Sequence, residues 1–127
     1  GKAEIKNELE NMDVKKKLEL MTVASSVQSG LKIDKNDIEF IKMDFENGII
    51  TGKVKGSETN VYTFQIDAKT KGVSHNCIDF SKNKARKKNI CKHLVKVFEL
   101  LLTEHGENGQ NLINNIIENR LTWNFFG

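Results

Sequence analysis

The stretch HNCIDFSKNKARKKNICKH, residues 75 to 93, is the most informative part of this 127-residue chain. It opens with a His-x-Cys pair and closes with a Cys-x-His pair, which together contain both cysteines and two of the three histidines. Two thiolates and two imidazoles form the donor set of a closed, tetrahedral, structural zinc site. We therefore expect one structural Zn²⁺ ion, bound by His75, Cys77, Cys91 and His93.

Two other interpretations of the cysteines compete with a metal site. One is a single disulfide, but small disulfide-stapled domains carry more cysteines and belong to secretory settings that nothing here signals. The other treats both cysteines as small buried apolar residues beside incidental histidines. Two mirrored pairs in a chain without further cysteines favour metal ligation. Because four protein ligands leave no open position for an activated water, we expect no catalysis at the metal.

Upstream of this stretch, from residue 38, apolar residues recur with the period of two that β-strands require. Ile41, Met43 and Phe45 share one face and precede Asn47-Gly48, a strong signal for a hairpin turn. A second alternating run follows with Ile50, Gly52 and Val54, and a turn is predicted after it at 57–60. A third run has Tyr62, Phe64 and Ile66, and a turn is predicted after it at 69–72. This pattern predicts a small antiparallel meander.

Helical periodicity flanks the meander on both sides. The first 30 residues carry two apolar stripes, with a break after Met12 that Asp13 caps and a stop at Gly30; the stripes are Val14, Leu18 and Met21, and Leu20, Ala24, Val27 and Leu31. After Cys91 a second helix is predicted to end at His105-Gly106, with Leu94, Val97, Phe98, Leu101 and Leu102 on its apolar face. A last helix follows, with one apolar face made of Leu112, Ile113, Ile116, Ile117 and Leu121.

These periods predict a single α+β domain over residues 1–127: a small antiparallel β-meander followed by a helix, with further helices at both ends. We expect an N-terminal helical region at 1–37, a meander with a zinc-finger module at 38–106, and a C-terminal helix with an aromatic tail at 107–127. Trp123, Phe125 and Phe126 are expected to fold back onto the core. Alternatively they form an exposed docking patch or the cut edge of a longer domain.

The ligand stretch resembles the SWIM zinc finger, a ββα module with the pattern C-x-C, a variable gap and C-x-H. That family commonly has an aromatic residue three positions after its second ligand, often preceded by an acid, and here Asp79 and Phe80 follow Cys77. The resemblance, which covers about residues 48–102, therefore makes His75 the first ligand, where the family usually has cysteine. Histidine is a competent zinc ligand, yet this departure leaves Asp79 open as a rival fourth ligand.

Cations crowd the connection between the two ligand pairs. Residues 81–93, the basic segment, contain no acid but six cations: Lys82, Lys84, Arg86, Lys87, Lys88 and Lys92. The whole chain has a net charge of only +3, so the remainder is net acidic and the charge is segregated. Such a segment can be a solvated loop, but it also suits sequence-independent contact with phosphates. Tyr62 and Phe80 could stack on bases nearby, although core packing is the simpler role.

The leading functional interpretation is a zinc-stabilised accessory module that binds nucleic acid, with DNA as the expected partner. SWIM-like modules accompany DNA-handling proteins such as chromatin-remodelling-type helicases, transposases and recombinase paralogues, so the resemblance implies the same partner. The alternative is a protein–protein adaptor in a DNA-repair, recombination or ubiquitin-ligase type assembly, which would use the N-terminal helix or the C-terminal aromatics. No nucleophile–base signature or glycine-rich phosphate loop indicates an enzyme, though the module could serve a larger one.

No apolar run approaches the roughly 20 residues of a membrane span, so no membrane partner is expected. Reduced cysteines at a zinc site would suit the cytoplasm, or the nucleus in a eukaryote. His105 has no partner motif and is expected at a helix end on the surface.

Overall fold

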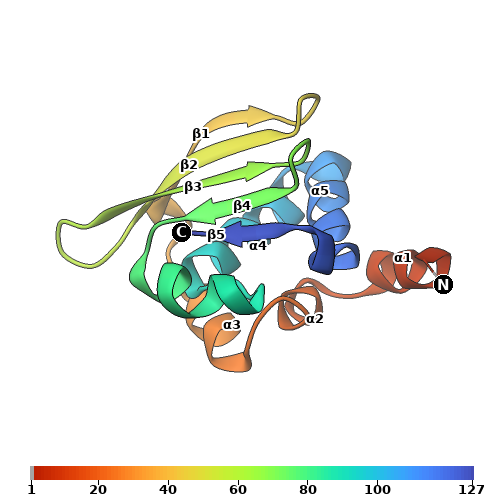
Figure 1. Cartoon of the computed structure of the whole chain (residues 1–127), viewed down its shortest axis with the longest axis horizontal. Helices are drawn as coiled ribbons and strands as arrows, with labels where there is room; N and C mark the ends of the chain where they lie inside the picture. Colours follow the sequence, from red (N-terminus) through yellow and green to blue (C-terminus); the bar gives the residue numbers. More distant parts are fainter. Residues whose placement is uncertain (1) are drawn as a thin grey trace.

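The computed structural model describes the backbone of residues 2–127 and the side chains of residue 4 and residues 7–127; residue 1 of the predicted N-terminal region lies outside this part. The described part has the predicted mixed α+β fold, with a five-stranded sheet and helices over one face (Figure 1). Its elements are α1 (Lys2–Asn11), α2 (Val14–Glu19), α3 (Ala24–Leu31), η1 (Lys35–Asp37), β1 (Ile38–Asp44), β2 (Ile49–Lys55), β3 (Val61–Asp67), β4 (Gly72–His75), η2 (Phe80–Lys84), η3 (Ala85–Lys87), α4 (Lys92–Glu104), α5 (Gly106–Glu118), η4 (Arg120–Thr122) and β5 (Asn124–Phe126).

The sheet runs in the order β1-β2-β3-β4-β5, and its first four strands form the antiparallel meander that the alternation predicts. Gly48 adopts a φ of +73° in the first hairpin, a conformation that glycine reaches without strain. The sequence pattern did not predict β5, which pairs in parallel with β4 through Val73 and Phe125. The C-terminus is thereby placed beside the strand that ends at the first histidine of the ligand stretch.

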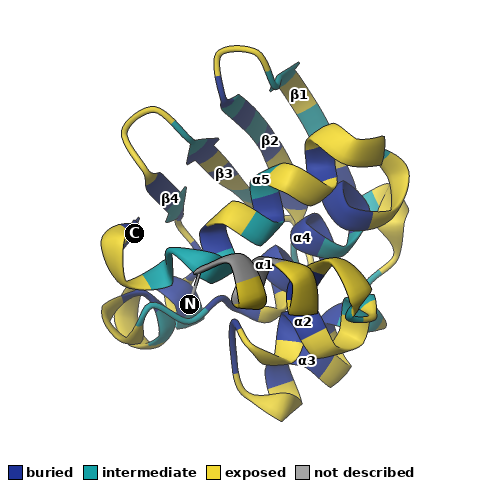
Figure 2. Ribbon diagram, turned by 90° about the vertical axis from the view of Figure 1, so that its right-hand side faces the viewer, coloured by how far each residue is buried: buried dark blue, intermediate teal, exposed yellow. Residues whose placement is uncertain are grey.

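One face of the sheet carries the core. Alternate residues of β2, β3 and β4 are buried against α4 and α5, which cover this face (Figure 2); they include Ile50, Val54, Phe64, Ile66 and Val73. From α4 the same core receives the predicted apolar face, Leu94, Val97, Phe98, Leu101 and Leu102. Burial of this shared face supplies the main driving force for folding, since each large apolar side chain removed from water contributes about 1.5–3 kcal/mol.

The edge strand β1 departs from the predicted alternation. The register with β2 shifts between Phe40 and Lys42, so a bulge interrupts the strand there. The extra residue, Ile41, is 58% exposed, and the prediction that it shares a face with Met43 and Phe45 is wrong. Phe40 points inward instead and packs edge-on against Phe64, with ring centroids 5.7 Å apart.

Between residues 2 and 31 the chain forms three short helices. The predicted break after Met12 is confirmed, and the Asp13 side chain caps α2 by accepting a hydrogen bond of 2.8 Å from the Lys16 amide. Gly30 lies inside α3 rather than after it, so its predicted role as a stop is wrong. A Cβ at Gly30 would lie 2.4 Å from the Cβ of Val95, so glycine allows α3 and α4 to pack closely.

The C-terminal part follows the prediction up to Glu118 and then departs from it. Helices α4 and α5 are separated only by His105, as its position predicts, and this side chain is half-buried against the rings of Phe40 and Phe45. Leu121 lies beyond the end of α5 and is 85% exposed, so its predicted place on the apolar helix face is wrong. The described residues include no helix long and apolar enough to span a membrane.

The aromatic tail folds back onto the core, as predicted, for two of its three residues. Trp123 and Phe125 are buried, and the indole Nε1 of Trp123 donates a hydrogen bond of 3.2 Å to the Oδ1 atom of Asn115. Phe126 is 53% exposed, on the opposite face of β5. The tail thus fastens the sheet edge to α5 while leaving one ring at the surface.

Candidate metal centre

The four residues of the mirrored pairs converge on one point. Their candidate ligand atoms all lie within 4.8 Å of one another, and all four side chains are buried. The set consists of His75 at the end of β4, Cys77 two residues later, Cys91 at the N-cap of α4, and His93 in its first turn. These residues could hold one metal ion between the last antiparallel strand and the helix that covers the sheet.

The backbone of β3 orients the imidazole of His75. The Nδ1 atom of this ring lies 2.7 Å from the carbonyl oxygen of Thr63. Because a carbonyl only accepts hydrogen bonds, Nδ1 must carry the proton, which leaves the lone pair on Nε2 directed at the site. Nε2 in turn lies 3.4 Å from Nδ1 of His93. The Asn76 side chain completes this link to β3 by accepting a hydrogen bond of 2.9 Å from the Thr63 amide.

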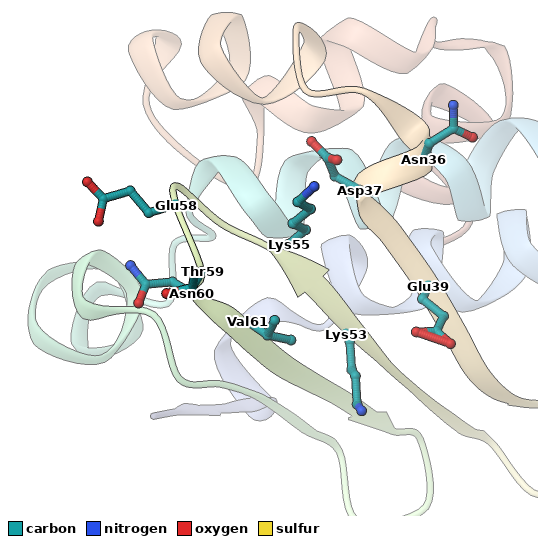
Figure 3. Close-up of a pocket in the computed structure, with 9 residues that line it drawn as sticks. All are labelled: Asn36, Asp37, Glu39, Lys53, Lys55, Glu58, Thr59, Asn60 and Val61. Carbon is teal, nitrogen blue, oxygen red and sulfur yellow. The ribbon is translucent and has the colours of Figure 1, made fainter.

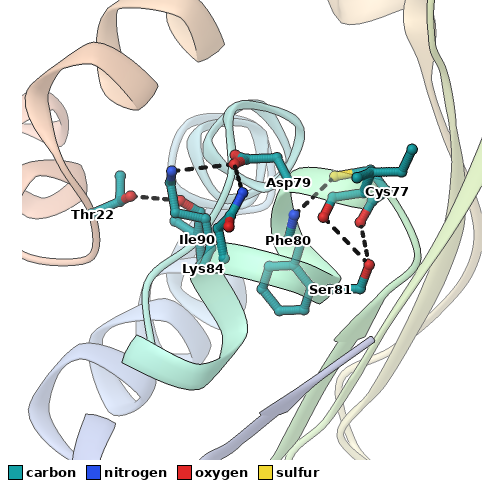
Figure 4. Close-up of polar contacts among 9 residues, drawn as sticks. Thr22, Cys77, Asp79, Phe80, Ser81, Lys84 and Ile90 are labelled. Carbon is teal, nitrogen blue, oxygen red and sulfur yellow. Dashed lines mark hydrogen bonds and ion pairs between the residues drawn. The ribbon is translucent and has the colours of Figure 1, made fainter.

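The two cysteine sulfurs lie in different electrostatic surroundings. The pKa of the Cys77 thiol is lowered, mainly by a hydrogen bond with Cys91 and also by contacts with both imidazoles and the Phe80 amide, whose nitrogen lies 3.4 Å from the sulfur (Figure 4). Burial raises the pKa of the Cys91 thiol, and the neighbouring Cys77 raises it further. The two sulfurs are close enough to influence each other's protonation, and a bound cation would favour the thiolate form of both.

Asp79, the rival fourth ligand, is directed away from the cluster. Its Oδ1 atom accepts a hydrogen bond of 3.2 Å from Asn83 and pairs with Nζ of Lys84 at 3.4 Å (Figure 4). It is absent from the group of converging ligand atoms among the described residues, and His75 takes the fourth position. Asp79 instead helps to hold the first turn of the basic segment.

Phe80 belongs to the core of this region. Its side chain is fully buried, with its ring centroid 5.7 Å from that of His75 and 6.5 Å from that of Phe125. A ring without exposed surface cannot stack on a base, so that interpretation of Phe80 is wrong and the packing interpretation is confirmed. Phe80 thus joins the ligand stretch to the aromatic tail.

The basic segment is a compact helical connection rather than the open loop that its composition indicates. The chain forms a turn of π-helix, η2, and then the short helix η3. The helical path ends at Lys88, whose φ of 56° is left-handed. The side chains of Lys82, Arg86, Lys87 and Lys92 are exposed. Two of the six cations are engaged within the protein: Lys84 pairs with Asp79, and Lys88 donates a hydrogen bond of 2.6 Å to the Leu121 carbonyl.

Arg120, which sequence reasoning missed, holds the end of the basic segment. Its Nε atom donates to the Lys88 carbonyl at 2.6 Å and Nη2 donates to the Lys87 carbonyl at 3.2 Å and to the Asn89 side chain. Nη1 reaches the Leu20 carbonyl at 3.3 Å. Burial lowers the pKa of Arg120, but a guanidinium remains charged. The sequence offered one signal for it: Arg120 is one of just two arginines in a chain that is rich in lysine.

A separate cavity of about 440 Å³ lies between the start of β1 and the β2–β3 connection (Figure 3). Both acidic and basic side chains line it: Asp37, Glu39, Lys53, Lys55 and Glu58. None of its lining residues belongs to the ligand cluster or the basic segment. Because the opposite charges offset one another, this cavity favours no single class of ligand.

Comparison with known proteins adds no relative. No protein-family model matches the chain, and neither the curated proteins nor the solved structures yielded a match. The chemistry of the centre therefore has to follow from its own donor atoms and surroundings.

Proposed function

We propose that this chain is a zinc-stabilised nucleic-acid-binding module, in which one structural Zn²⁺ secures the fold and the basic segment contacts the phosphates of DNA. The observation that carries the proposal is the position of the basic segment, which starts four residues after Cys77 and ends with the second ligand pair of the same buried cluster. A metal bound to both pairs would fix the approach to this segment and its end. Its cations would then be held on one surface.

The donor set favours zinc as the metal. Two nitrogens at about 2.0–2.1 Å from one tetrahedral zinc are about 3.3–3.4 Å apart. The Nε2 atom of His75 and the Nδ1 atom of His93 lie 3.4 Å apart, so they match one edge of such a tetrahedron. Buried thiolates and imidazoles in this geometry are typical of a structural zinc site. With four protein ligands the ion would have no open position, and we propose no catalytic activity for the chain itself.

The arrangement around the cluster supports membership of a SWIM-like zinc-finger class. Strands β3 and β4 pair up to the first ligand, His75, and α4 begins directly after Cys91, with the short helical turns η2 and η3 between β4 and α4. Phe80, the aromatic residue that carries the resemblance, packs on His75 from within the core. The resemblance implies a role in DNA-handling assemblies. A reducing compartment, the cytoplasm or nucleus, would keep the thiolates able to bind metal.

Four exposed cations are the proposed contacts with DNA: Lys82, Arg86, Lys87 and Lys92. Contacts of this kind displace counterions from the phosphates, so affinity should fall linearly with salt on logarithmic axes, with a slope of about −0.9 for each phosphate neutralised. Charge alone reads no base sequence, so binding should depend little on sequence.

The proposal is tested by titrating matched single- and double-stranded oligonucleotides across a salt series. Changing the four exposed cations to serine should abolish measurable binding and leave the zinc content unchanged. A matched control changes four exposed lysines elsewhere, Lys32, Lys42, Lys53 and Lys55, and so removes the same charge. Equal losses of affinity in both variants would mean that net charge, and not the basic segment, is responsible for binding. An unmodified protein that does not bind at low salt would refute the nucleic-acid function.

A protein adaptor remains the second candidate, favoured by apolar side chains at the surface. Leu121, whose carbonyl accepts a hydrogen bond from Lys88, is highly exposed, and Phe126 lies exposed on the edge strand β5. A partner protein would cover these residues in the repair, recombination or ubiquitin-ligase type assembly that the resemblance implies. Changing Leu121 and Phe126 to serine should then weaken capture of that partner without changing the salt-dependent binding of DNA.

A further inference from the structure

The ring of Tyr62 lies against both imidazoles of the ligand cluster. Its centroid is 5.3 Å from that of His93, with the planes tilted by 36°, and 6.0 Å from that of His75, which it meets edge-on. Tyr62 is next in β3 to Thr63, whose carbonyl orients His75. A single strand therefore supplies both the hydrogen bond that holds one imidazole and the ring that covers the pair.

The β2–β3 connection supports this ring. A Cβ at Gly56 would lie only 2.6 Å from Cε2 of Tyr62, so the backbone of residue 56 approaches the ring more closely than any other residue type would allow. The amide of Gly56 donates a hydrogen bond of 2.8 Å to the Asn60 carbonyl, and the Asn60 amide donates to Ser57 at 3.1 Å. The connection is thereby closed on itself and keeps Tyr62 between Gly56 and the imidazoles.

Exposure within the cluster shows where solvent would approach. Cys91 is fully buried, and His75 and Cys77 are 2% and 3% exposed, whereas His93 is 9% exposed. His93 is therefore the most accessible of the four residues. It is also the imidazole that Tyr62 approaches most closely.

We infer that Tyr62 is the shield of the metal centre and sets the rate at which the bound ion is lost to competing ligands. The inference rests on the proposed zinc site, but it does not require DNA binding. Before a metal can leave a closed tetrahedral site, water or a chelator must replace one protein donor. A ring over the imidazole of His93 obstructs that approach and holds this residue in place. Tyr62 therefore has a positioning and shielding role, and it is not itself a ligand.

The test loads the full chain with Zn²⁺ or Co²⁺ and follows transfer of the metal to excess EDTA. Tyr62→Ala should accelerate transfer by about tenfold, at the lower end of the effect of residues that support metal ligands. Tyr62→Phe keeps the ring and should transfer metal within about twofold of the unmodified rate. Gly56→Ala keeps the tyrosine but displaces its ring, and should give an intermediate acceleration. The visible spectrum of the Co²⁺ form reports whether the coordination itself has changed.

Phe40→Ala is the matched control, because Phe40 is also an aromatic residue on the inner face of the sheet but packs on Phe64 and His105 instead of the ligands. A rate for Tyr62→Ala no faster than that of the Phe40 variant would overturn the inference. So would a Tyr62→Phe rate as fast as that of Tyr62→Ala, because the hydroxyl and not the ring would then be responsible. A chain that takes up no metal overturns the zinc site and the shield together. Failure to bind DNA overturns only the nucleic-acid function.

Discussion

The Nε2 atom of His75 and the Nδ1 atom of His93 face each other at 3.4 Å, so the two histidines present different ring nitrogens to the same point. For His75 the choice of nitrogen is made by the Thr63 carbonyl, which occupies Nδ1. His93 lies in the first turn of α4 and presents Nδ1, the nitrogen nearer its own backbone. The strand thus turns the far side of a ring toward the candidate metal position, and the helix turns the near side.

This geometry predicts that His75 and His93 are both required for metal binding and that the third histidine is not. His75→Ala or His93→Ala should lower zinc affinity by more than about 100-fold, because even residues that only support ligands contribute 10–100-fold. His105→Ala should retain full affinity, since His105 packs on Phe40 and Phe45 outside the cluster. Competition with a zinc-sensitive chelating dye measures all three affinities.

Asp79→Asn separates the two ligand assignments that the sequence left open. We expect the variant to keep its zinc, because Asp79 bonds to Asn83 and Lys84 rather than to the cluster. Loss of metal in this variant, together with its retention in His75→Ala, would reverse the assignment.

Arg120 is expected to stabilise the fold through the carbonyls it caps. Arg120→Ala leaves the carbonyls of Lys87, Lys88 and Leu20 without these donors, and the free energy of unfolding should fall by about 1–3 kcal/mol. Arg120→Lys should recover only part of the loss, since an ammonium cannot reproduce the fork of a guanidinium. Arg86→Ala removes the other arginine, which is exposed, and should change stability by no more than about 0.5 kcal/mol. Urea denaturation of the zinc-loaded proteins measures these differences; equal effects of the two arginines would contradict the prediction.

The features that could be predicted from the sequence are those in which residues close together in the chain are sufficient to define the local structure. The ligand cluster follows from the donor set and its spacing, and the meander follows from alternation punctuated by turn residues such as Asn47-Gly48. The cap at Asp13 is similar, because a side chain and an amide three residues apart are enough to define it.

The features that the sequence did not predict depend on contacts between distant parts of the chain. Three residues of β5 form a strand only because β4 offers a free edge beside them. Arg120 acts on carbonyls more than 30 residues away, and backbone acceptors leave no trace in the sequence. The bulge at Ile41 reverses the side-chain pattern of an edge strand, where pairing on one side only constrains the register weakly.

Trp123 is expected to be a major anchor of the C-terminal strand. Its side chain is fully buried and its indole bonds to Asn115, so Trp123→Ala should lower the free energy of unfolding by about 3–5 kcal/mol. Phe126→Ala removes a neighbouring ring of the same tail that is half exposed, and its effect should be much smaller. Thermal denaturation of both variants provides the comparison; similar losses would show that β5 contributes as a unit and not through the buried indole.

Gly30→Ala tests the close packing of α3 on α4. Alanine favours a helix over glycine by about 1 kcal/mol, so in isolation the change would stabilise α3. Here the new Cβ would lie 2.4 Å from the Cβ of Val95 and 2.6 Å from the Lys92 carbonyl, and we expect overpacking to cost about 1–3 kcal/mol. Val95→Ala in the same chain removes the Val95 Cγ1 methyl, which the new Cβ would approach to 2.5 Å, but keeps the Val95 Cβ and the Lys92 carbonyl. Because part of the overlap is relieved, the double variant should be more stable than the sum of the single effects. Strictly additive changes in the free energy of unfolding, measured by urea denaturation, would mean that residues 30 and 95 are not in contact.

Removal of the metal should loosen the molecule locally before it unfolds. The proposed ion joins the end of β4 to the start of α4, so without it residues 75–93 lose their cross-link and Cys91 is left as a buried thiol. Ile50, Leu101 and Ile113 belong to the same apolar core but lie on β2, α4 and α5, outside the ligand stretch. Hydrogen exchange in EDTA should therefore show faster exchange of the amides at 75–93, while β1, β2 and α5 stay protected. Adding Zn²⁺ should restore the protection, and a uniform loss across the chain would instead mean that the metal is required for the whole fold. If chelation leaves exchange at 75–93 unchanged in protein shown to contain zinc, the ion does not stabilise this region and its structural role is refuted.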